Sequence, residues 1–75
     1  MIDPSKITEI LNKHDISVEE MDDTDPSHAY WLTEEYGDIE TGRGGRTILF
    51  SHPNKLPKHM SWVKELFLLK EQDGE

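Results

Sequence analysis

The stretch from Tyr30 to Phe50, YWLTEEYGDIETGRGGRTILF, decides the fold of this chain. It contains four of the six aromatic residues, at positions 30, 31, 36 and 50. Aromatic and β-branched residues favour strands on both sides of a glycine-rich centre. The residues between Thr41 and Arg46 include three glycines, which adopt positive φ angles readily. This pattern predicts two β-segments that fold back on each other across a Gly/Arg tip, with the return strand near residues 46–51.

Strand alternation predicts which side chains of this hairpin face the core. Gly37 indicates a bulge or a tight turn inside the first segment, and a bulge would reverse the alternation after it. With that reversal, we expect one face to hold the apolar residues Tyr30, Leu32 and Ile39. The opposite, exposed face would then hold Trp31 together with the acidic residues Glu35, Asp38 and Glu40.

The flanking segments read as helices. Asp3 and Pro4 provide a cap and a first helical residue, and apolar residues follow at helical spacing, so we expect a helix over residues 4–14. Ser17 and Glu20 fit a capping box, which predicts a short second helix over 18–23, with an extended segment as the alternative. A third helix is expected over residues 58–72. Its broad apolar face comprises Met60, Val63, Leu66, Phe67 and Leu69, with Trp62 beside it.

These elements predict one small α+β domain over residues 1–75, with the helices packed on one face of an antiparallel hairpin or meander and a frayed tail at 72–75. Only 33% of the residues are hydrophobic, so the core is thin. The chain has no cysteine, which excludes disulfides and thiolate metal sites. Its first residues show no signal-peptide pattern, and no apolar run is long enough to cross a bilayer, so we expect a cytoplasmic protein.

The net charge of −8 is unevenly distributed along the chain. Residues 1–41 contain twelve acidic residues and two lysines, a net charge of −10, whereas residues 42–75 have a net charge of +2. Between Asp15 and Glu40 there are ten acidic residues and no lysine or arginine. A field of this sign repels phosphate groups, which disfavours direct binding to nucleic acid or to an anionic membrane. The belt is either a solvated, solubilising surface or a surface complementary to a basic protein.

Motifs for catalysis are lacking. No serine lies in a Gly-x-Ser-x-Gly pattern, and a thin core gives poor support to a preorganised site. We therefore expect a non-enzymatic protein with no cofactor. Residues 23–34 place oxygen ligands at several positions of a calcium-loop frame, but His28 stands where that loop needs glycine, so no metal site is expected. The Gly42–Arg46 tip resembles a short Arg/Gly nucleic-acid tip or a phosphate nest, but it lacks the Walker pattern. It reads either as a solvated turn or as a protein contact.

The first hypothesis is a protein-binding module, an inhibitor or regulator whose acidic aromatic face docks on a basic surface of a larger protein, including nucleic-acid-binding surfaces. Small acidic inhibitors from phages and mobile elements act in this way, and the analogy rests on size and charge alone. The expected contacts are Trp31, Glu34, Glu35, Asp38, Glu40, Arg43 and Arg46. The alternative is a structural subunit or homodimer formed through the apolar face of the last helix, with Trp62 and Phe67. A third hypothesis is a metal-responsive loop around Asp23 and Asp25.

Overall fold

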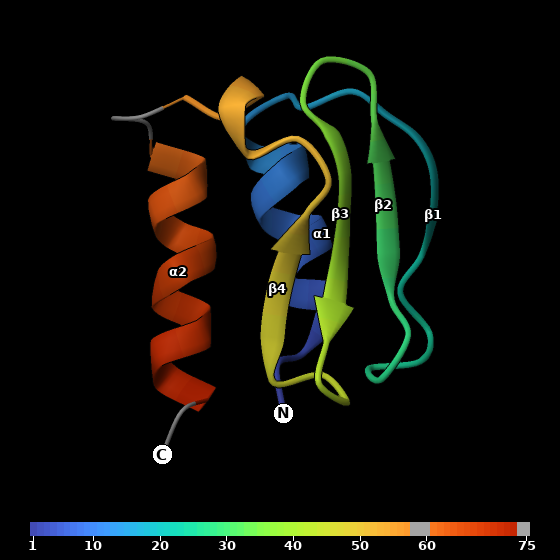
Figure 1. The fold of residues 1–75 in the computed structure, drawn as a ribbon, viewed down its shortest axis with the longest axis vertical. Helices are drawn as coiled ribbons and strands as arrows, with labels where there is room; N and C mark the ends of the chain where they lie inside the picture. The colour runs from blue at the N-terminus through green and yellow to red at the C-terminus, as the bar shows by residue number, and fades with distance from the viewer. Residues whose placement is uncertain (58–60, 74–75) are drawn as a thin grey trace.

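The computed structural model describes residues 1–57 and 61–73 and confirms the α+β class. One helix precedes a four-stranded antiparallel sheet, and a second helix follows it (Figure 1). The elements in chain order are α1 (Pro4–Lys13), β1 (Val18–Asp22), β2 (Tyr30–Thr33), β3 (Gly37–Gly42), β4 (Thr47–Phe50), the 3-10 turn η1 (Pro53–Lys55) and α2 (Ser61–Asp73). The sheet is a meander, because every strand pairs with its neighbour in the chain.

Helix α1 begins and ends as its sequence dictates. The Asp3 carboxylate accepts a hydrogen bond from the N–H of Ser5 at 3.0 Å, which confirms the predicted cap. At the other end, the N–H groups of Asp15 and Ile16 donate to the carbonyls of Asn12 and Leu11, the pattern of a Schellman motif. Asp15 occupies the left-handed position of that motif with φ of 56°, where glycine would be unstrained.

The helix predicted over residues 18–23 is wrong. These residues form the edge strand β1, with Met21 opposite Trp31 and Asp22 opposite Tyr30. The extended alternative therefore holds. A helix of six residues is marginal without tertiary support, whereas a strand here gains ladder hydrogen bonds along β2.

The turn between β2 and β3 determines which side chains face the core. Thr33 pairs with Gly37, so the loop consists of residues 34–36, and Gly37 has φ of 78°. Gly37 therefore closes a tight turn, and the alternation continues unchanged from β2 to β3, with Trp31 opposite Ile39. The prediction that Tyr30 and Leu32 lie inside while Trp31 lies outside is wrong. The inner face receives Trp31, Thr33, Ile39 and Thr41, all of which are buried.

Thr33 and Thr41 occupy the inner face because local bonds satisfy their hydroxyls. The Thr33 hydroxyl donates to the carbonyl of Gly37 at 2.6 Å and accepts from the N–H of Tyr36 at 3.0 Å. The Thr41 hydroxyl accepts from the N–H of Ala29 and donates to the carbonyl of Pro26, each at 3.1 Å. Both hydroxyls thus hold the loops that flank β2, and neither leaves a buried polar group without a partner.

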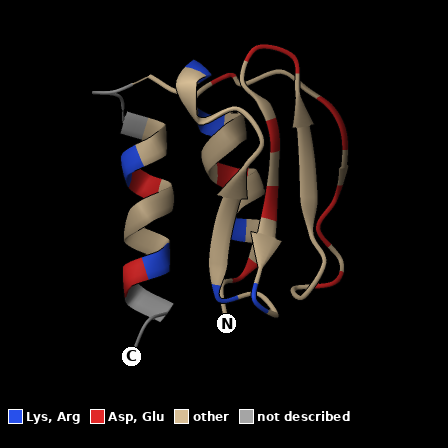
Figure 2. Cartoon of the chain, in the orientation of Figure 1, with Lys and Arg blue, Asp and Glu red and all other residues tan. Residues whose placement is uncertain are grey.

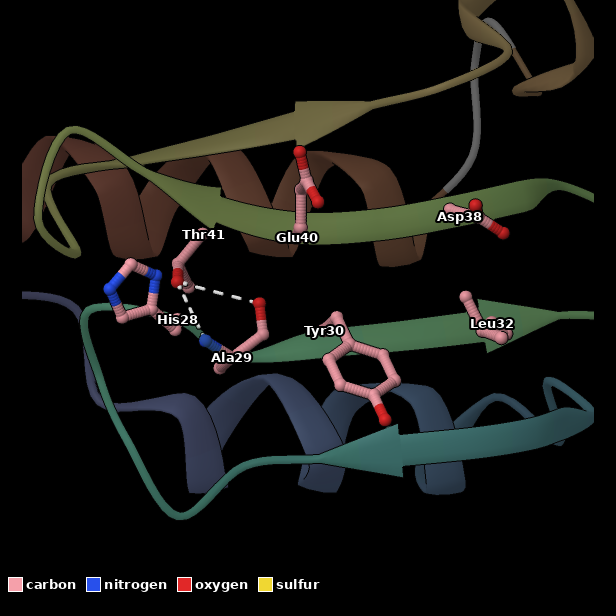
Figure 3. A pocket seen from close by; sticks show the side chains of 7 residues that line it. All are labelled: His28, Ala29, Tyr30, Leu32, Asp38, Glu40 and Thr41. Carbon is pink, nitrogen blue, oxygen red and sulfur yellow. Dashed lines mark hydrogen bonds between the residues drawn. The ribbon is translucent and has the colours of Figure 1, made fainter.

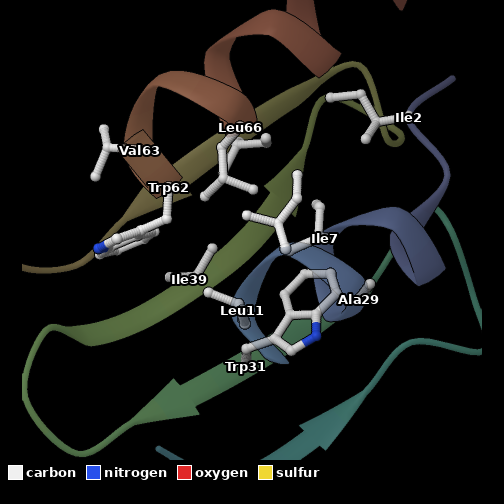
Figure 4. Close-up of a cluster of buried hydrophobic side chains, with 11 residues drawn as sticks. Ile2, Ile7, Leu11, Ala29, Trp31, Ile39, Trp62, Val63 and Leu66 are labelled. Atoms are coloured by element: carbon white, nitrogen blue, oxygen red, sulfur yellow. The ribbon is translucent and has the colours of Figure 1, made fainter. Parts of the chain in front are cut away.

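The core lies between the inner face of the sheet and the two helices (Figure 4). Trp31 is its largest fully buried side chain, and its indole N–H donates to the hydroxyl of Thr8 on α1 at 3.0 Å. That hydroxyl donates in turn to the Asp23 carboxylate at 2.7 Å. The other buried apolar residues are Ile2, Ile7, Ile10, Leu11, Ala29, Ile39, Ile48, Trp62, Val63 and Leu66.

Helix α2 packs beside α1 and next to β4. Trp62 is buried with its ring 5.1 Å from that of Tyr36, and Phe67 meets Phe50 edge to face at 6.2 Å. Glu65 bonds both Lys13 and His14 at the end of α1. The predicted third helix is confirmed over its described part, and Met60 and residues 58–59 lie outside the described residues. Residues 72 and 73, predicted to fray, belong to the helix, and residues 74–75 are again outside the described range.

The start of the chain is bonded to the β3–β4 tip. The N–H of Ile2 donates to the carbonyl of Gly45 in the β3–β4 tip at 2.7 Å. A Cβ atom on Gly45, whose φ is 92°, would lie 2.6 Å from the carbonyl oxygen of Pro26, so the glycine permits this close approach. Within the described chain, no helix is long and apolar enough to cross a membrane.

Candidate functional site: the open acidic face of the sheet

The outer face of the sheet is the candidate site. In Figure 1, α1 lies behind the sheet and α2 lies beside β4, and no helix among the described residues covers the opposite face. Because paired residues share a face, the register assigns Glu20 and Asp22 of β1 to this outer side, together with the β2 residues Tyr30 and Leu32. Strand β3 adds Asp38 and Glu40, and β4 adds Leu49. We call this set the acidic sheet face.

The acidic residues of this face form two cross-strand rows. One row runs from Glu20 over Leu32 to Asp38, and the other runs from Asp22 over Tyr30 to Glu40. Strand spacing separates the backbones of the two acids in each row by about 10 Å, and neighbouring acids on one strand are about 7 Å apart. All four acids are exposed, so four carboxylates surround one aromatic and one aliphatic side chain.

A shallow depression of about 280 Å³ lies over β2 and β3, at the end of the two rows where Asp38 and Glu40 stand (Figure 3). Its lining includes Tyr30, Leu32, Asp38 and Glu40, all on the outer side of β2 and β3. The apolar side chains are half-buried and the carboxylates stand free of the surface. The depression can accept the end of a partner's side chain, which would contact Tyr30 and Leu32 at its base and the carboxylates of Asp38 and Glu40 at its rim.

Lysine and arginine are absent from the acidic sheet face (Figure 2). Acidic residues mark β1, the β1–β2 loop, β3 and the β2–β3 loop. The described basic residues lie on η1, on the β3–β4 tip and on the helices, and the helices carry acidic residues as well. Asp22 keeps its negative charge to low pH, because bonds from the hydroxyl and N–H of Thr24 lower the pKa of its carboxyl group. Asp22 is therefore anionic across the physiological range.

The structure places the predicted contact residues in three different locations. Asp38 and Glu40 lie on the acidic sheet face, as the hypothesis requires. Trp31 does not, because it is fully buried. The prediction that it is an exposed anchor is wrong, since the unbroken alternation from β2 to β3 places it on the inner face. Arg43 and Arg46 are exposed at the opposite end of the sheet from the β2–β3 loop (Figure 1).

The β2–β3 loop carries the remaining two predicted residues, Glu34 and Glu35, both exposed. Tyr36 anchors this loop against Trp62, and burial together with the Glu35 carboxylate beside it raises the pKa of the Tyr36 hydroxyl. The loop extends the negative surface past the ends of the strands, so these two acids lie beside the acidic sheet face and not within it.

Sequence reasoning missed the part of the site contributed by β1 and by the outer side of β2: Glu20, Asp22, Tyr30 and Leu32. A three-residue turn at 34–36 was the signal that could have identified Tyr30 and Leu32. With that turn, residues whose numbers sum to 70 are paired, so Trp31 and Ile39 share one face and Tyr30 and Glu40 share the other. The same reasoning identifies Tyr30 as the aromatic residue of the site.

The metal-responsive loop gains no support. In residues 1–57 and 61–73, no group of three or more histidine or acidic side chains could hold a metal ion. The loop acids instead cap their own backbone: Asp25 accepts from the N–H of Ser27 at 2.9 Å, and Asp23 accepts from Thr8. These bonds give the loop its shape.

Comparison of the chain with protein-family models, with curated proteins and with solved structures finds no match.

Proposed function

We propose that this protein is a non-enzymatic binding module that docks its acidic sheet face onto a basic surface of a larger protein. The observation that carries the proposal is the combination of an uncovered sheet face with four exposed carboxylates around Tyr30 and Leu32. No lysine or arginine occurs between Asp15 and Glu40 to neutralise them. Inhibition or regulation of the partner is the consequence we expect of covering its basic surface.

The mutual repulsion of the carboxylates on this face favours a binding role over a purely solubilising one. Two unit charges 7 Å apart repel each other by about 0.6 kcal/mol in a water-like dielectric, before screening by salt. Asp38 and Glu40 carry this cost on β3, and Glu20 and Asp22 carry it on β1. A basic partner removes the repulsion on docking, whereas a purely solubilising surface gains nothing from grouping the charges on one rigid face.

The apolar residues between the carboxylates supply the second requirement of an interface. Tyrosine is enriched among interface anchors, because its ring buries a large area at a small entropic cost. Tyr30 and Leu32 lie at the centre of the two acidic rows, so a docked partner would exclude water from the charge pairs around them. Charge pairs in such a setting contribute to specificity and to fast association.

A nucleic-acid-binding surface is the partner class that fits this face best. Such surfaces hold arginines and lysines in arrays that receive regularly spaced phosphates. The carboxylates of the acidic sheet face repeat at about 7 Å along the strands and about 10 Å across them, on a rigid β scaffold. The protein would therefore occupy the surface in place of nucleic acid.

The test is affinity capture from the lysate of the native cell or of a related host. The tag belongs at the C-terminus, because the second residue of the chain is buried and bonded to the β3–β4 tip. Capture is compared at 0.1 M and 0.5 M salt, since the Debye length is about 10 Å at 0.1 M and contracts to a few Å at the higher concentration. The test variant is Asp38→Asn with Glu40→Gln. The matched control is Glu9→Gln with Glu71→Gln, which removes two exposed charges from the helices.

We expect one basic protein to be captured by the wild type and by the control, to be lost at 0.5 M salt, and to be absent with the test variant. Added duplex DNA should displace it if the covered surface binds nucleic acid. A partner that the test variant retains as well as the control does would refute docking through this face, and a DNA-insensitive partner would refute only the nucleic-acid class.

Self-association through α2 is the second candidate. Phe67 and Leu68 are 45% and 48% exposed, and Leu49 on neighbouring β4 is 46% exposed. Trp62 is not available to such an interface, because it is buried against Tyr36, so Trp62→Ala would damage the core and is no test of dimerisation. The suitable variant is Phe67→Ser with Leu68→Ser. Sedimentation at about 0.5 M salt should show a dimer that this variant dissociates, and a wild-type monomer would exclude the candidate.

A further inference from the structure

A second depression, of about 470 Å³, lies between the β3–β4 tip and the end of α2, and it shares Leu49, the cross-strand partner of Glu40, with the acidic sheet face. Its lining brings together Arg43 and Arg46 from the β3–β4 tip, Lys70 from the last turn of α2, and Thr47 and Leu49 from β4. None of the five lining residues is acidic, in a protein whose net charge is −8. Three positive side chains from two distant parts of the chain therefore converge on one concave surface.

We propose that this depression binds a small organic phosphate, with the phosphoryl group held by the two arginines and the lysine and the organic group against Leu49. A guanidinium group matches phosphate oxygens with two parallel donors, and an ammonium group adds a compact charge. The Thr47 hydroxyl supplies a further donor. The volume falls within the range of small-molecule sites and exceeds what a bare phosphate ion requires.

Leu49 gives the site its apolar part. Its side chain is 46% exposed, and it lies across the place where residue 42 would carry a Cβ atom, which would be only 2.8 Å from the leucine Cδ1. Gly42 thus leaves room for Leu49 to lie over the sheet beside the arginines. An apolar side chain at this exposure next to three cations suits a ligand with one anionic and one apolar end.

The backbone of the tip supports a functional role for Arg43. Its φ of 52° lies in the left-handed region, which glycine or asparagine occupies with less strain. Arg43 is followed by Gly44 and Gly45, also at positive φ. Where a strained position carries a large charged residue, the side chain is a candidate for function.

The acidic sheet face restricts the class of ligand. A long polyanion such as nucleic acid would extend from the tip into the field of the carboxylates on β1 and β3 and would be repelled. A small phosphate ester remains within the local positive field of the depression. The occupant is therefore a small phosphate ester, which the titration below distinguishes from free phosphate.

The experiment is an NMR titration of the ¹⁵N-labelled full chain with inorganic phosphate and, separately, with phenyl phosphate, at constant ionic strength set by sodium chloride. We expect saturable shifts of the amides of residues 43–47 and 70 with both probes. Phenyl phosphate should bind about fivefold more tightly, because its ring covers Leu49. Leu49→Ser should abolish that difference while leaving the affinity for inorganic phosphate unchanged.

Two charge variants and a control complete the test. Arg46→Gln should weaken both probes about tenfold or more, as expected for loss of a charge-assisted bond. Lys55→Gln removes an exposed lysine on η1, at the far end of the molecule, and should leave both affinities unchanged (Figure 1). Arg43→Asn should weaken binding while the thermal midpoint stays equal or rises, which separates loss of the site from loss of the fold.

Shifts that fail to saturate by about 50 mM of either probe would overturn the proposal. Equal phosphate affinities for Arg46→Gln and Lys55→Gln would overturn it as well, since the loss of affinity would then reflect only the lower total positive charge of the protein. If phenyl phosphate bound no tighter than inorganic phosphate in the wild type, the assignment of an organic ligand would fail.

Discussion

Replacing Thr8 by valine tests how the sheet is attached to α1. The Thr8 hydroxyl accepts the indole N–H of Trp31 at 3.0 Å and donates to the Asp23 carboxylate at 2.7 Å. It thereby joins the helix, the second strand and the loop after β1 through one oxygen atom. Valine has nearly the same shape as threonine and replaces the hydroxyl by a methyl group, which can neither donate nor accept a hydrogen bond.

The expected loss of stability follows from the burial of Trp31. Its side chain is fully buried, so its N–H would lose a partner without gaining water, at a cost of about 1–3 kcal/mol. Asp23 is only half-buried and can bond water instead, so we take about 2 kcal/mol for the change as a whole. A chain of this length unfolds with about 4–11 kcal/mol, so the loss is a large fraction of the total.

Urea denaturation followed by tryptophan fluorescence and circular dichroism measures the effect. With a slope of about 1 kcal/mol/M for so small a domain, Thr8→Val should lower the midpoint by about 2 M. Thr8→Ser keeps the hydroxyl and should lose much less. In a Trp31→Phe background, which lacks the indole N–H, the additional cost of Thr8→Val should fall below about 1 kcal/mol. An undiminished cost in that background would refute the assigned hydrogen bond as its source.

Three further predictions concern stability. Asp15→Gly should raise the free energy of unfolding by about 0.5–1 kcal/mol in the same assay, because it relieves the left-handed strain at the end of α1, and Asp15→Ala, which removes the same charge, should give no such gain. Bonds from neighbouring groups lower the pKa of Asp3, Asp22 and Glu65 in the folded state, so their stabilisation is complete at neutral pH and should decline below about pH 5; a flat acid limb in pH-dependent urea titrations would contradict this. Leu66→Ala should cost about 2–5 kcal/mol by calorimetry, while Leu68→Ala, at an exposed position on the same helix, should cost less than about 1 kcal/mol.

Local signals predicted much of the fold. Asp3 and Pro4 fixed the start of α1, and the glycines after Gly42 fixed the tip between β3 and β4, because caps and turns depend on residues close in sequence. A helix was preferred to an extended segment for β1 because the capping-box pattern is local, whereas the strand state depends on pairing with β2. Tertiary pairing outweighed a weak helical preference there.

The candidate site depended on one turn. A bulge and a three-residue turn at Gly37 are both compatible with the sequence, yet they expose opposite sides of β2. The predicted bulge would expose Trp31 and bury Tyr30, whereas in the structure Trp31 is buried and Tyr30 lies on the outer face. Asp38 and Glu40 were placed correctly, because the apolar residue between them identifies the inner side of β3 in either case.

The meander has a consequence for how the chain folds. Its hairpins close over short loops, such as residues 34–36, which form within microseconds. The contacts that span most of the chain are made by the segment before α1, through Ile2 to the tip, and by α2, through Glu65 to the end of α1. We expect the helices to dock after the hairpins have formed, since closing a long loop delays the contacts that depend on it. Losing the Glu65 contacts should then speed unfolding far more than it slows folding.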